Sequence, residues 1–480
     1  MLNTSVISVI RTFSSIEIKR FEDFLLSPYY NKKSAVVNLF RIIKKHEPDF
    51  SSVNLERKKI WGRLYKNKDF NYGVMKNLIY DLGKCADIFI EIQNYERDNK
   101  LRGMVIMKEQ MNRELNSAFE RSMKGYKNLL SEMKQDYEYF YYNYRAFKLE
   151  REYTADINKA NAEKIVDEER EIEYLTLFYL NECADVYNTL LINNSYLDKD
   201  IKSDNLKTFV EFMENFEHSY KEITDCSLLS LKIIIDKTDD SVYKRLKKIF
   251  TDNSHKFSST FNSYMGLTLM EYCNRNIMNG KTEYVKEMYE ISLYIFENKL
   301  LMNDKKAYMN PFVFTQLVST ACSLNKFNWV KNFIDENMEK INPEYRDKFY
   351  NFALLTLNFK MNNFNQAMNH VAKMEVKSQM DHVSVKRYEL MIYYESGYTD
   401  ELYSLIEAFR NFISKNKKLA ESVKLQAGKF IYFVKRFSDI KFNSNKTDKI
   451  KISVLKDELL KTEVINKIWL LEKAEELSNY

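Results

Sequence analysis

A run of 140 residues without glycine or proline constrains this chain more than any motif in it. The run lies between Gly125 and Gly266, and the 480 residues of the sequence include only 9 Gly and 4 Pro. Tight turns and phosphate-binding loops rely on glycine because it adopts positive φ at little cost. Helices joined by short polar turns need far less of it. The sequence therefore predicts an all-α fold and offers little material for a nucleotide-binding loop.

The composition is typical of a folded chain with a charged surface. Hydrophobic residues make up 45% of the sequence and charged residues 30%. No stretch approaches the roughly 18 apolar residues of a membrane span, and the first ten residues lack the basic start of a signal peptide. The five cysteines form no CxxC pair, which fits reduced thiols inside a cell. We expect a soluble, cytoplasmic protein that does not bind membranes.

Hydrophobic periodicity and local charge predict four parts. The first helix should begin at Ser14, whose hydroxyl and the Glu17 carboxylate can form a reciprocal capping box. The predicted parts are a basic N-terminal helical module (1–98), a central region of long helices (99–255), helical repeats (256–440) and a C-terminal capping helix (441–480).

Three segments in the second half of the chain share one pattern. Asn325, Asn362 and Gly397 each precede an aromatic residue (Phe327, Phe364 and Tyr398) that opens an apolar helix, and these aromatic residues are 37 and 34 residues apart. Such a spacing is typical of one helix-turn-helix unit per step. Asn and Gly tolerate the left-handed conformation that ends a first helix. The pattern predicts successive antiparallel helical hairpins.

The clearest copy of this turn, Asn363-Phe364-x-x-Ala367, resembles the opening of the second helix of the tetratricopeptide repeat (TPR). The sequence departs from that family at Leu355, where the family places a small residue. The resemblance covers about residues 310–415 and implies hairpins stacked as an α-solenoid, with a concave groove for a protein or peptide partner. The residues that we expect to be exposed in this groove are Asn363, Asn365, Asn369, Lys373 and Tyr394.

Near the N-terminus, the segment from Glu17 to Asn31 is similar to one found in a family of uncharacterised helical bacterial proteins. The similarity covers roughly the first hundred residues. It implies no activity, and only that a module of this kind commonly precedes helical repeats.

Motifs for catalysis or for cofactor binding are missing from the sequence. Gly280-Lys281-Thr282 imitates the end of a phosphate loop, but the glycine required five positions earlier is Arg275. The five histidines include no pair at i, i+4, and neither GxSxG nor HExxH occurs. We therefore expect no enzymatic activity, no cofactor and no metal site.

The segment from Lys32 to Lys68 is strongly basic, with eleven Lys and Arg against three Asp and Glu. Its third and fourth predicted helices, joined by a short turn at 67–72, could act as a helix-turn-helix reader of DNA. Salt-sensitive phosphate binding would follow from such charge. The residues expected to contact a polyanion are Lys44, Lys45, Lys58, Lys59 and Arg63.

Two functions thus remain open at the level of sequence. The first is a non-enzymatic protein-protein interaction scaffold that binds its partner through a TPR-like groove. The alternative is a nucleic-acid-associated regulator that uses the basic module. The sequence specifies neither the partner nor the oligomeric state.

Overall fold

The computed structural model describes residues 4–157, 167–197, 204–236, 239–301, 308–443 and 449–479. The prediction of an all-α fold is confirmed, because the described residues form 23 α-helices, no strand and only an isolated β-bridge between Gln135 and Phe257. Of the helices in the described ranges, none combines the length and apolar character that crossing a membrane requires.

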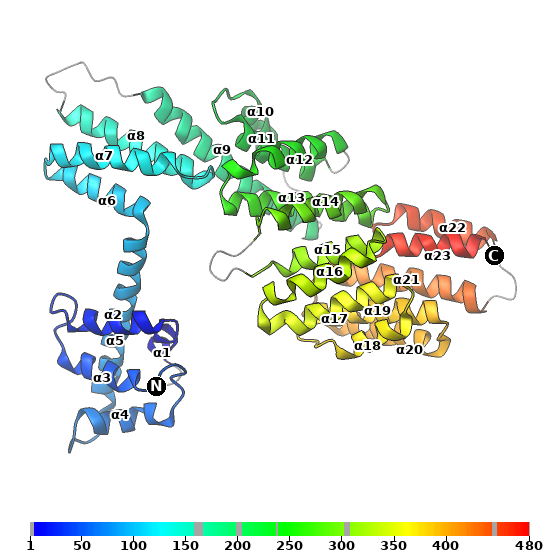
Figure 1. The fold of residues 1–480 in the computed structure, drawn as a ribbon, viewed down its shortest axis with the longest axis horizontal. Coiled ribbons are helices and arrows are strands. Elements are labelled where there is room, and N and C mark those ends of the chain that lie inside the picture. Colours follow the sequence, from blue (N-terminus) through cyan, green and yellow to red (C-terminus); the bar gives the residue numbers. More distant parts are fainter. Residues whose placement is uncertain are drawn as a thin grey trace. The chain divides into compact units, whose positions relative to one another are not determined.

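The chain divides into two compact units (Figure 1), and helix α8 (Tyr137–Ile157) contributes residues to both. The first unit also contains α1 (Ser5–Ile10), α2 (Ser15–Leu26), α3 (Ser34–Lys44), the 3-10 helix η1 (Val53–Leu55), α4 (Arg57–Leu64), α5 (Tyr72–Arg97), α6 (Asn99–Asn112) and α7 (Asn116–Ser131).

The second unit contains the remaining helices of the described chain. They are α9 (Glu168–Leu197), α10 (Asp204–Asn215), α11 (Lys221–Ile235), α12 (Asp240–Asn253), η2 (Ser254–Lys256), α13 (Ser259–Met278), α14 (Glu283–Glu297), α15 (Pro311–Ser323), α16 (Phe327–Asn337), η3 (Met338–Lys340), α17 (Pro343–Lys360), α18 (Phe364–Lys373), α19 (Gln379–Ser396), α20 (Thr399–Lys415), α21 (Glu421–Asn443), α22 (Lys449–Lys461) and α23 (Lys467–Ser478).

An aromatic core holds the N-terminal helices of the first unit together. Phe21 of α2 is fully buried, and its ring lies 4.9 Å from that of Phe40 on α3 and 5.1 Å from that of Phe89 on α5. The predicted capping box is confirmed, since the Glu17 amide donates to the Ser14 hydroxyl and the Ser14 amide to the Glu17 carboxylate. The cap starts α2 where its apolar face meets α3 and α5.

The helix pairs of the second half end with the turn that the sequence predicts. Asn325, Asn362 and Gly397 have φ of 56°, 59° and 74°, which is the left-handed conformation. One residue after each of them, a backbone amide reaches back to a carbonyl five residues earlier, as Tyr398 N does to Tyr393 O at 3.1 Å. These bonds satisfy carbonyls at the helix end and reverse the chain.

The same turn also connects α13 to α14, where Gly280 has a φ of 86°. Four helix pairs therefore follow one another in sequence (α13–α14, α15–α16, α17–α18 and α19–α20), and the helices of each pair contact each other. α14 packs on α15, α15 and α16 pack on α17, α18 packs on α19, and α20 packs on α21.

The prediction of a single C-terminal capping helix at 441–480 is wrong. α21 runs on to Asn443, and two helices follow it, α22 and α23. The chain bends between them at Asn466, whose φ is 56°. α23 packs on α13, α21 and α22, and Glu472, Glu475 and Glu476 on it are exposed. Its role as a cap of the helical array stays a prediction.

Candidate functional site

Four of the five residues predicted to line a groove lie on or beside α18. Asn363, Asn365, Asn369 and Lys373 are all exposed. The expectation that Tyr394 is exposed is wrong, because its side chain on α19 is only 1% accessible.

Tyr394 is buried because helix α23 covers it. The Trp469 ring lies 5.4 Å from the Tyr394 ring in an edge-on arrangement, and the Lys441 ammonium lies 4.3 Å from the centre of the Tyr394 ring. Burial raises the pKa of the Tyr394 hydroxyl. The surface that this residue would offer to a partner is thus occupied by the chain itself.

Polar bonds fix α23 in this position. The Trp469 indole N–H donates to Oε1 of Glu395 at 2.7 Å, and Nζ of Lys473 lies 2.8 Å from the same carboxylate. Burial opposes the positive charge of Lys473, but its bonds to Glu395 and Glu476 hold its pKa above the ordinary value. A buried lysine with two carboxylate partners is consistent with a fixed helix rather than a loosely attached tail.

An open groove lies at one end of the α19–α20 pair. It is shallow and almost fully open to solvent, and the space above its lining residues is about 620 Å³. We call it the lysine groove, and its lining residues are Gln379, Ala408, Asn411, Phe412, Lys415, Asn416, Lys417 and Lys418. No acidic residue is among them, so the lining combines three lysines with polar amides and the apolar side chains of Ala408 and Phe412.

Local chain geometry builds the lysine groove. The Asn416 side-chain amide donates to Oε1 of Gln379, which links the end of α20 to the start of α19. Oδ1 of Asn416 accepts from the Lys418 amide at 3.0 Å and shapes the turn that carries the lysines. The Phe412 ring, which is part of the lining, lies 5.4 Å from the imidazole of His382.

The three lysines of the groove are exposed. Over the described ranges, no carboxylate forms an ion pair with Lys415, Lys417 or Lys418, whereas many other surface lysines have such a partner, for example Lys424 with Glu421 at 2.6 Å. Like charges close together and unneutralised attract an anionic ligand.

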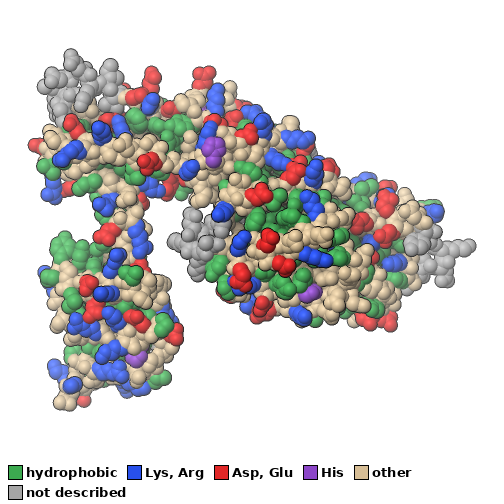
Figure 2. Space-filling model, viewed as in Figure 1, with side chains coloured by type: hydrophobic (Ala, Val, Ile, Leu, Met, Phe, Trp, Pro, Cys, Tyr) green, Lys and Arg blue, Asp and Glu red, His purple; other side chains and the backbone are tan. Residues whose placement is uncertain are grey.

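The residues of the predicted polyanion site are only partly available. Lys44 lies 2.8 Å from Glu22, and Lys59 lies 3.9 Å from the exposed carboxylate of Glu56. Lys45, Lys58 and Arg63 are exposed, and within the described chain no ion pair engages them. Figure 2 shows acidic side chains among the basic ones on the visible face of this module.

The predicted turn between α4 and α5 is present. Asn67 adopts a φ of 62°, and the Trp61 indole N–H donates to the Lys68 carbonyl at 2.9 Å across the turn. The turn is therefore held to the α4 helix. Its role in reading DNA stays a prediction.

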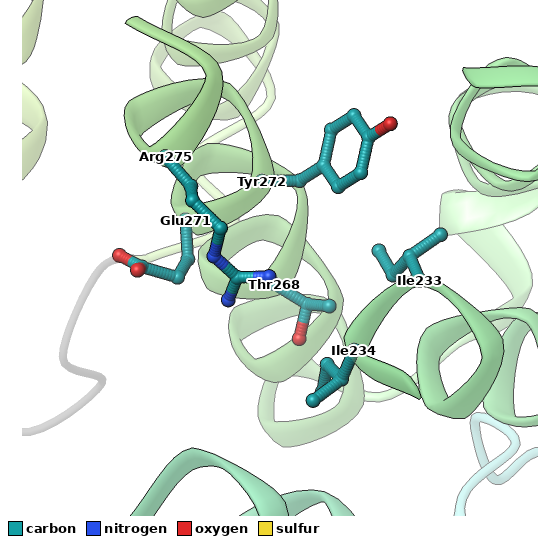
Figure 3. A pocket seen from close by; sticks show the side chains of 6 residues that line it. All are labelled: Ile233, Ile234, Thr268, Glu271, Tyr272 and Arg275. Carbon is teal, nitrogen blue, oxygen red and sulfur yellow. The ribbon is translucent and has the colours of Figure 1, made fainter. Parts of the chain in front are cut away.

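A small cavity between α11 and α13 lacks the room for a substrate. Its volume is about 20 Å³, on the order of a single water molecule. Ile233 and Ile234 of α11 line one side, and Thr268, Glu271, Tyr272 and Arg275 of α13 line the other. Figure 3 shows the Arg275 guanidinium extending towards Thr268 and the Tyr272 ring directed away from Glu271.

Glu271 is the acidic residue of this cavity. Burial raises the pKa of its carboxyl group, which the charge of Arg275 counteracts. A raised carboxyl pKa occurs in catalytic acids, but a catalytic role needs space for a substrate as well. The cavity offers none, so we interpret Glu271 as a half-buried structural residue.

Neither metal binding nor thiol chemistry finds support in the described ranges. Within them, no three His, Cys, Asp or Glu side chains gather closely enough to hold a metal ion. Four of the five cysteines are buried, and burial raises the pKa of the Cys273 and Cys322 thiols to about 12. Such thiols stay protonated and unreactive at neutral pH.

Comparison with known proteins adds no family to this description. No protein-family model, no curated protein and no solved structure matches the chain.

Sequence reasoning missed the lysine groove. The run from Lys415 to Lys418 was a visible signal, because it places three lysines in four residues just after a predicted apolar helix. The contribution of Gln379 could not be recognised, since it lies on the preceding helix and reaches the groove only through the hairpin.

Proposed function

We propose that this chain is a non-enzymatic scaffold that binds an acidic peptide segment of a protein partner in the lysine groove. The observation that carries the proposal is the group of three unpaired lysines in an open groove that Ala408 and Phe412 also line. Ammonium and amide N–H groups are the natural donors to carboxylates, and charge-assisted bonds are the stronger ones.

The shape of the groove favours a peptide over a small metabolite. Small-molecule sites bury most of the ligand surface in a concave pocket. The lysine groove instead opens to solvent, which suits an extended or helical segment that leaves one side exposed. Ala408 and Phe412 would contact apolar side chains of that segment, while the lysines contact its acidic ones.

We also infer that the helix pairs from α13 to α20 form a TPR-like α-solenoid. Support comes from the common left-handed turn, the packing of successive pairs and the apolar contacts between them. In this proposal the solenoid holds the lysine groove rigidly in place, which lowers the entropy cost of binding.

The test of the proposal is a titration of the full chain with a fluorescein-labelled ten-residue peptide of alternating Glu and Leu, followed by fluorescence anisotropy. A peptide of alternating Lys and Leu serves as the counterpart. We expect saturable binding of the acidic peptide alone, weakened roughly tenfold or more when Lys415, Lys417 and Lys418 are all changed to Ala.

A matched control removes the same number of charges elsewhere in the second unit. Lys331, Lys449 and Lys461 are exposed, and their joint change to Ala should leave the affinity within about twofold, because distant exposed charges are screened. Equal losses in both triple variants would show that only net charge matters and would contradict the proposal.

A nucleic-acid-associated function is the second candidate. The exposed side chains of Lys45, Lys58 and Arg63 support it. Changing Lys58 and Arg63 to Glu should abolish binding of a labelled DNA duplex if this candidate is correct, and should leave the acidic peptide bound as before. A wild-type chain that binds no duplex at low salt would remove this candidate.

A further inference from the structure

One long helix of the second unit carries an apolar stripe that faces solvent. Ile172, Leu175, Tyr179, Val186 and Leu190 of α9 are 62%, 43%, 51%, 59% and 41% exposed. Their spacings of three, four, seven and four residues place them on one face of the helix. We call these five residues the α9 stripe.

The opposite face of α9 is a true core face. Leu177, Leu180 and Ala184 are buried against neighbouring helices, and the contacts of the helix are mainly with α11. α9 is therefore apolar on two sides. Packing within the unit accounts for one side. On the α9 stripe, the Tyr179 ring lies 6.0 Å from the Phe209 ring of α10, and all five residues of the stripe remain exposed to solvent.

A stripe of this kind fits another helix. Apolar residues that recur every three or four positions form the ridge that packs into a facing helix in two-helix contacts. The stripe runs from Ile172 to Leu190, which corresponds to roughly 27 Å of helix at the usual rise per residue. This length matches a helical segment of about 18 residues.

The charge beside the stripe indicates which helix would bind. Arg170 is the only basic residue from Glu168 to Leu190, and it is paired with Asp167 at 3.1 Å. By helical spacing, Glu168 and Glu182 fall on the stripe or along one edge of it. Asp185 lies farther round the helix and lines a cavity with Ser227 and Tyr264. In the part of the chain that the structure describes, no cation is paired with Glu182 or Asp185.

Both carboxylates are in an unfavourable environment for a negative charge. Burial raises the pKa of Asp185, and burial together with the charge of Asp185 raises the pKa of Glu182. A cation placed beside them would relieve this unfavourable environment. A second copy of the same face would instead add carboxylates to carboxylates.

We propose that the α9 stripe is a docking surface for an amphipathic helix of a partner protein whose apolar face is flanked by Lys or Arg. The surface is separate from the lysine groove, whose preferred ligand has the opposite charge. A chain with both surfaces would connect an acidic segment of one partner with a basic helix of another.

The probe for this proposal is an 18-residue peptide of Leu and Lys in which the leucines recur every three or four residues, labelled and titrated with the full chain. Two comparison peptides carry the same residues in scrambled order, or Glu in place of every Lys. The titrations use the chain in which Lys415, Lys417 and Lys418 are changed to Ala, so that the lysine groove does not bind the Glu-containing peptide. In this chain the proposal predicts binding of the amphipathic basic peptide and at least tenfold weaker binding of both comparison peptides.

Two variants assign the binding to the α9 stripe. Changing Ile172 and Val186 together to Gln should weaken binding roughly tenfold or more, because both would lose apolar burial. Changing Glu168 and Glu182 together to Gln should weaken it about threefold to tenfold and reduce its dependence on salt. All four positions are outside the fully buried core, so these chains are expected to fold.

The control pair is Leu425→Gln with Ile450→Gln, because these residues are 58% and 78% exposed on other helices. It should leave binding unchanged. Equal binding of the Glu-containing peptide would overturn the proposal. So would self-association of the wild-type chain that the Ile172→Gln, Val186→Gln variant abolishes in analytical ultracentrifugation, since the stripe would then join two copies.

Discussion

Replacing Trp469 by alanine should destabilise the C-terminal half of the second unit. The Trp469 side chain is 5% exposed, and its ring lies 5.4 Å from that of Tyr394 and 6.1 Å from that of Phe430. Removing a buried tryptophan side chain costs about 3–5 kcal/mol in free energy of unfolding. The indole bond to Glu395 at 2.7 Å is part of this cost.

A second substitution separates packing from hydrogen bonding. Trp469→Phe keeps an aromatic ring but removes the N–H donor, and Glu395 retains Lys473 as a partner. The loss should therefore be smaller, about 1–2 kcal/mol for the missing bond together with the imperfect fit of the smaller ring.

The assay is hydrogen exchange of the full chain, read peptide by peptide. A single free energy of unfolding is not well defined for a chain with two compact units. In Trp469→Ala, amides of α19, α21 and α23 should exchange about a hundredfold faster or more, since each 1.4 kcal/mol corresponds to a factor of ten.

The control variant is Leu460→Ala, because Leu460 is 52% exposed on α22 and should change stability by no more than about 0.5 kcal/mol. Amides of α2 to α5 provide an internal reference in the other unit. Unchanged exchange in Trp469→Ala would refute the conclusion that α23 is part of the core.

Three further predictions concern turns, packing and pH. Gly397→Ala should destabilise the α19–α20 hairpin by about 1–2 kcal/mol, because a residue with a side chain is strained at a φ of 74°. Faster hydrogen exchange of the α19 and α20 amides in the variant would test this. Gly103→Ala should be destabilising by about 1–3 kcal/mol despite the better helix propensity of alanine, because the new methyl group would collide with the Tyr126 ring. A higher melting temperature of the variant would contradict this close packing of α6 on α7. Burial opposes ionisation of Asp381, but the Lys348 ammonium at 2.5 Å and the Ser378 amide hold the pKa of its carboxyl group below the ordinary value. The stability that the ionised Asp381 contributes is therefore complete above the unfolded-state pKa near 4, and it is lost as the pH falls through the lower pKa of the folded state. In Asp381→Asn, this loss of stability at acid pH should be smaller, as measured by denaturation from about pH 6 to pH 2.

Local features of the fold could be predicted from the sequence because their causes are local. The left-handed turns at Asn325, Asn362 and Gly397 follow from the conformational freedom of Asn and Gly. The capping box at Ser14 depends on two side chains three residues apart. Neither feature requires knowledge of a distant segment.

The groove prediction failed at Tyr394 because its exposure depends on a distant helix. Periodicity placed this residue correctly on a helix but could not show that Trp469 would cover it. The bend at Asn466 was missed for a related reason, since no glycine or proline marks it and α22 and α23 read as one amphipathic pattern.

The lysine groove could be predicted from the sequence only in part. The lysines after α20 form a visible run in the sequence, whereas the pairing of Asn416 with Gln379 joins the ends of two helices. The packing of α19 against α20 decides which group of lysines lines the groove. The charge of a lysine in the sequence does not show whether it is unpaired, as Lys417 is, or paired with a carboxylate.

The most direct test of the scaffold proposal is a photo-crosslinking measurement at the lysine groove. Ala408 lines the groove and is exposed, so a benzophenone side chain at position 408 would lie where the acidic peptide is proposed to bind. Irradiation with the Glu and Leu peptide should give a saturable crosslink, mapped by mass spectrometry, which excess unlabelled acidic peptide suppresses and the Lys and Leu peptide does not. A crosslink of equal yield with both peptides, or none at saturating acidic peptide, would contradict the account.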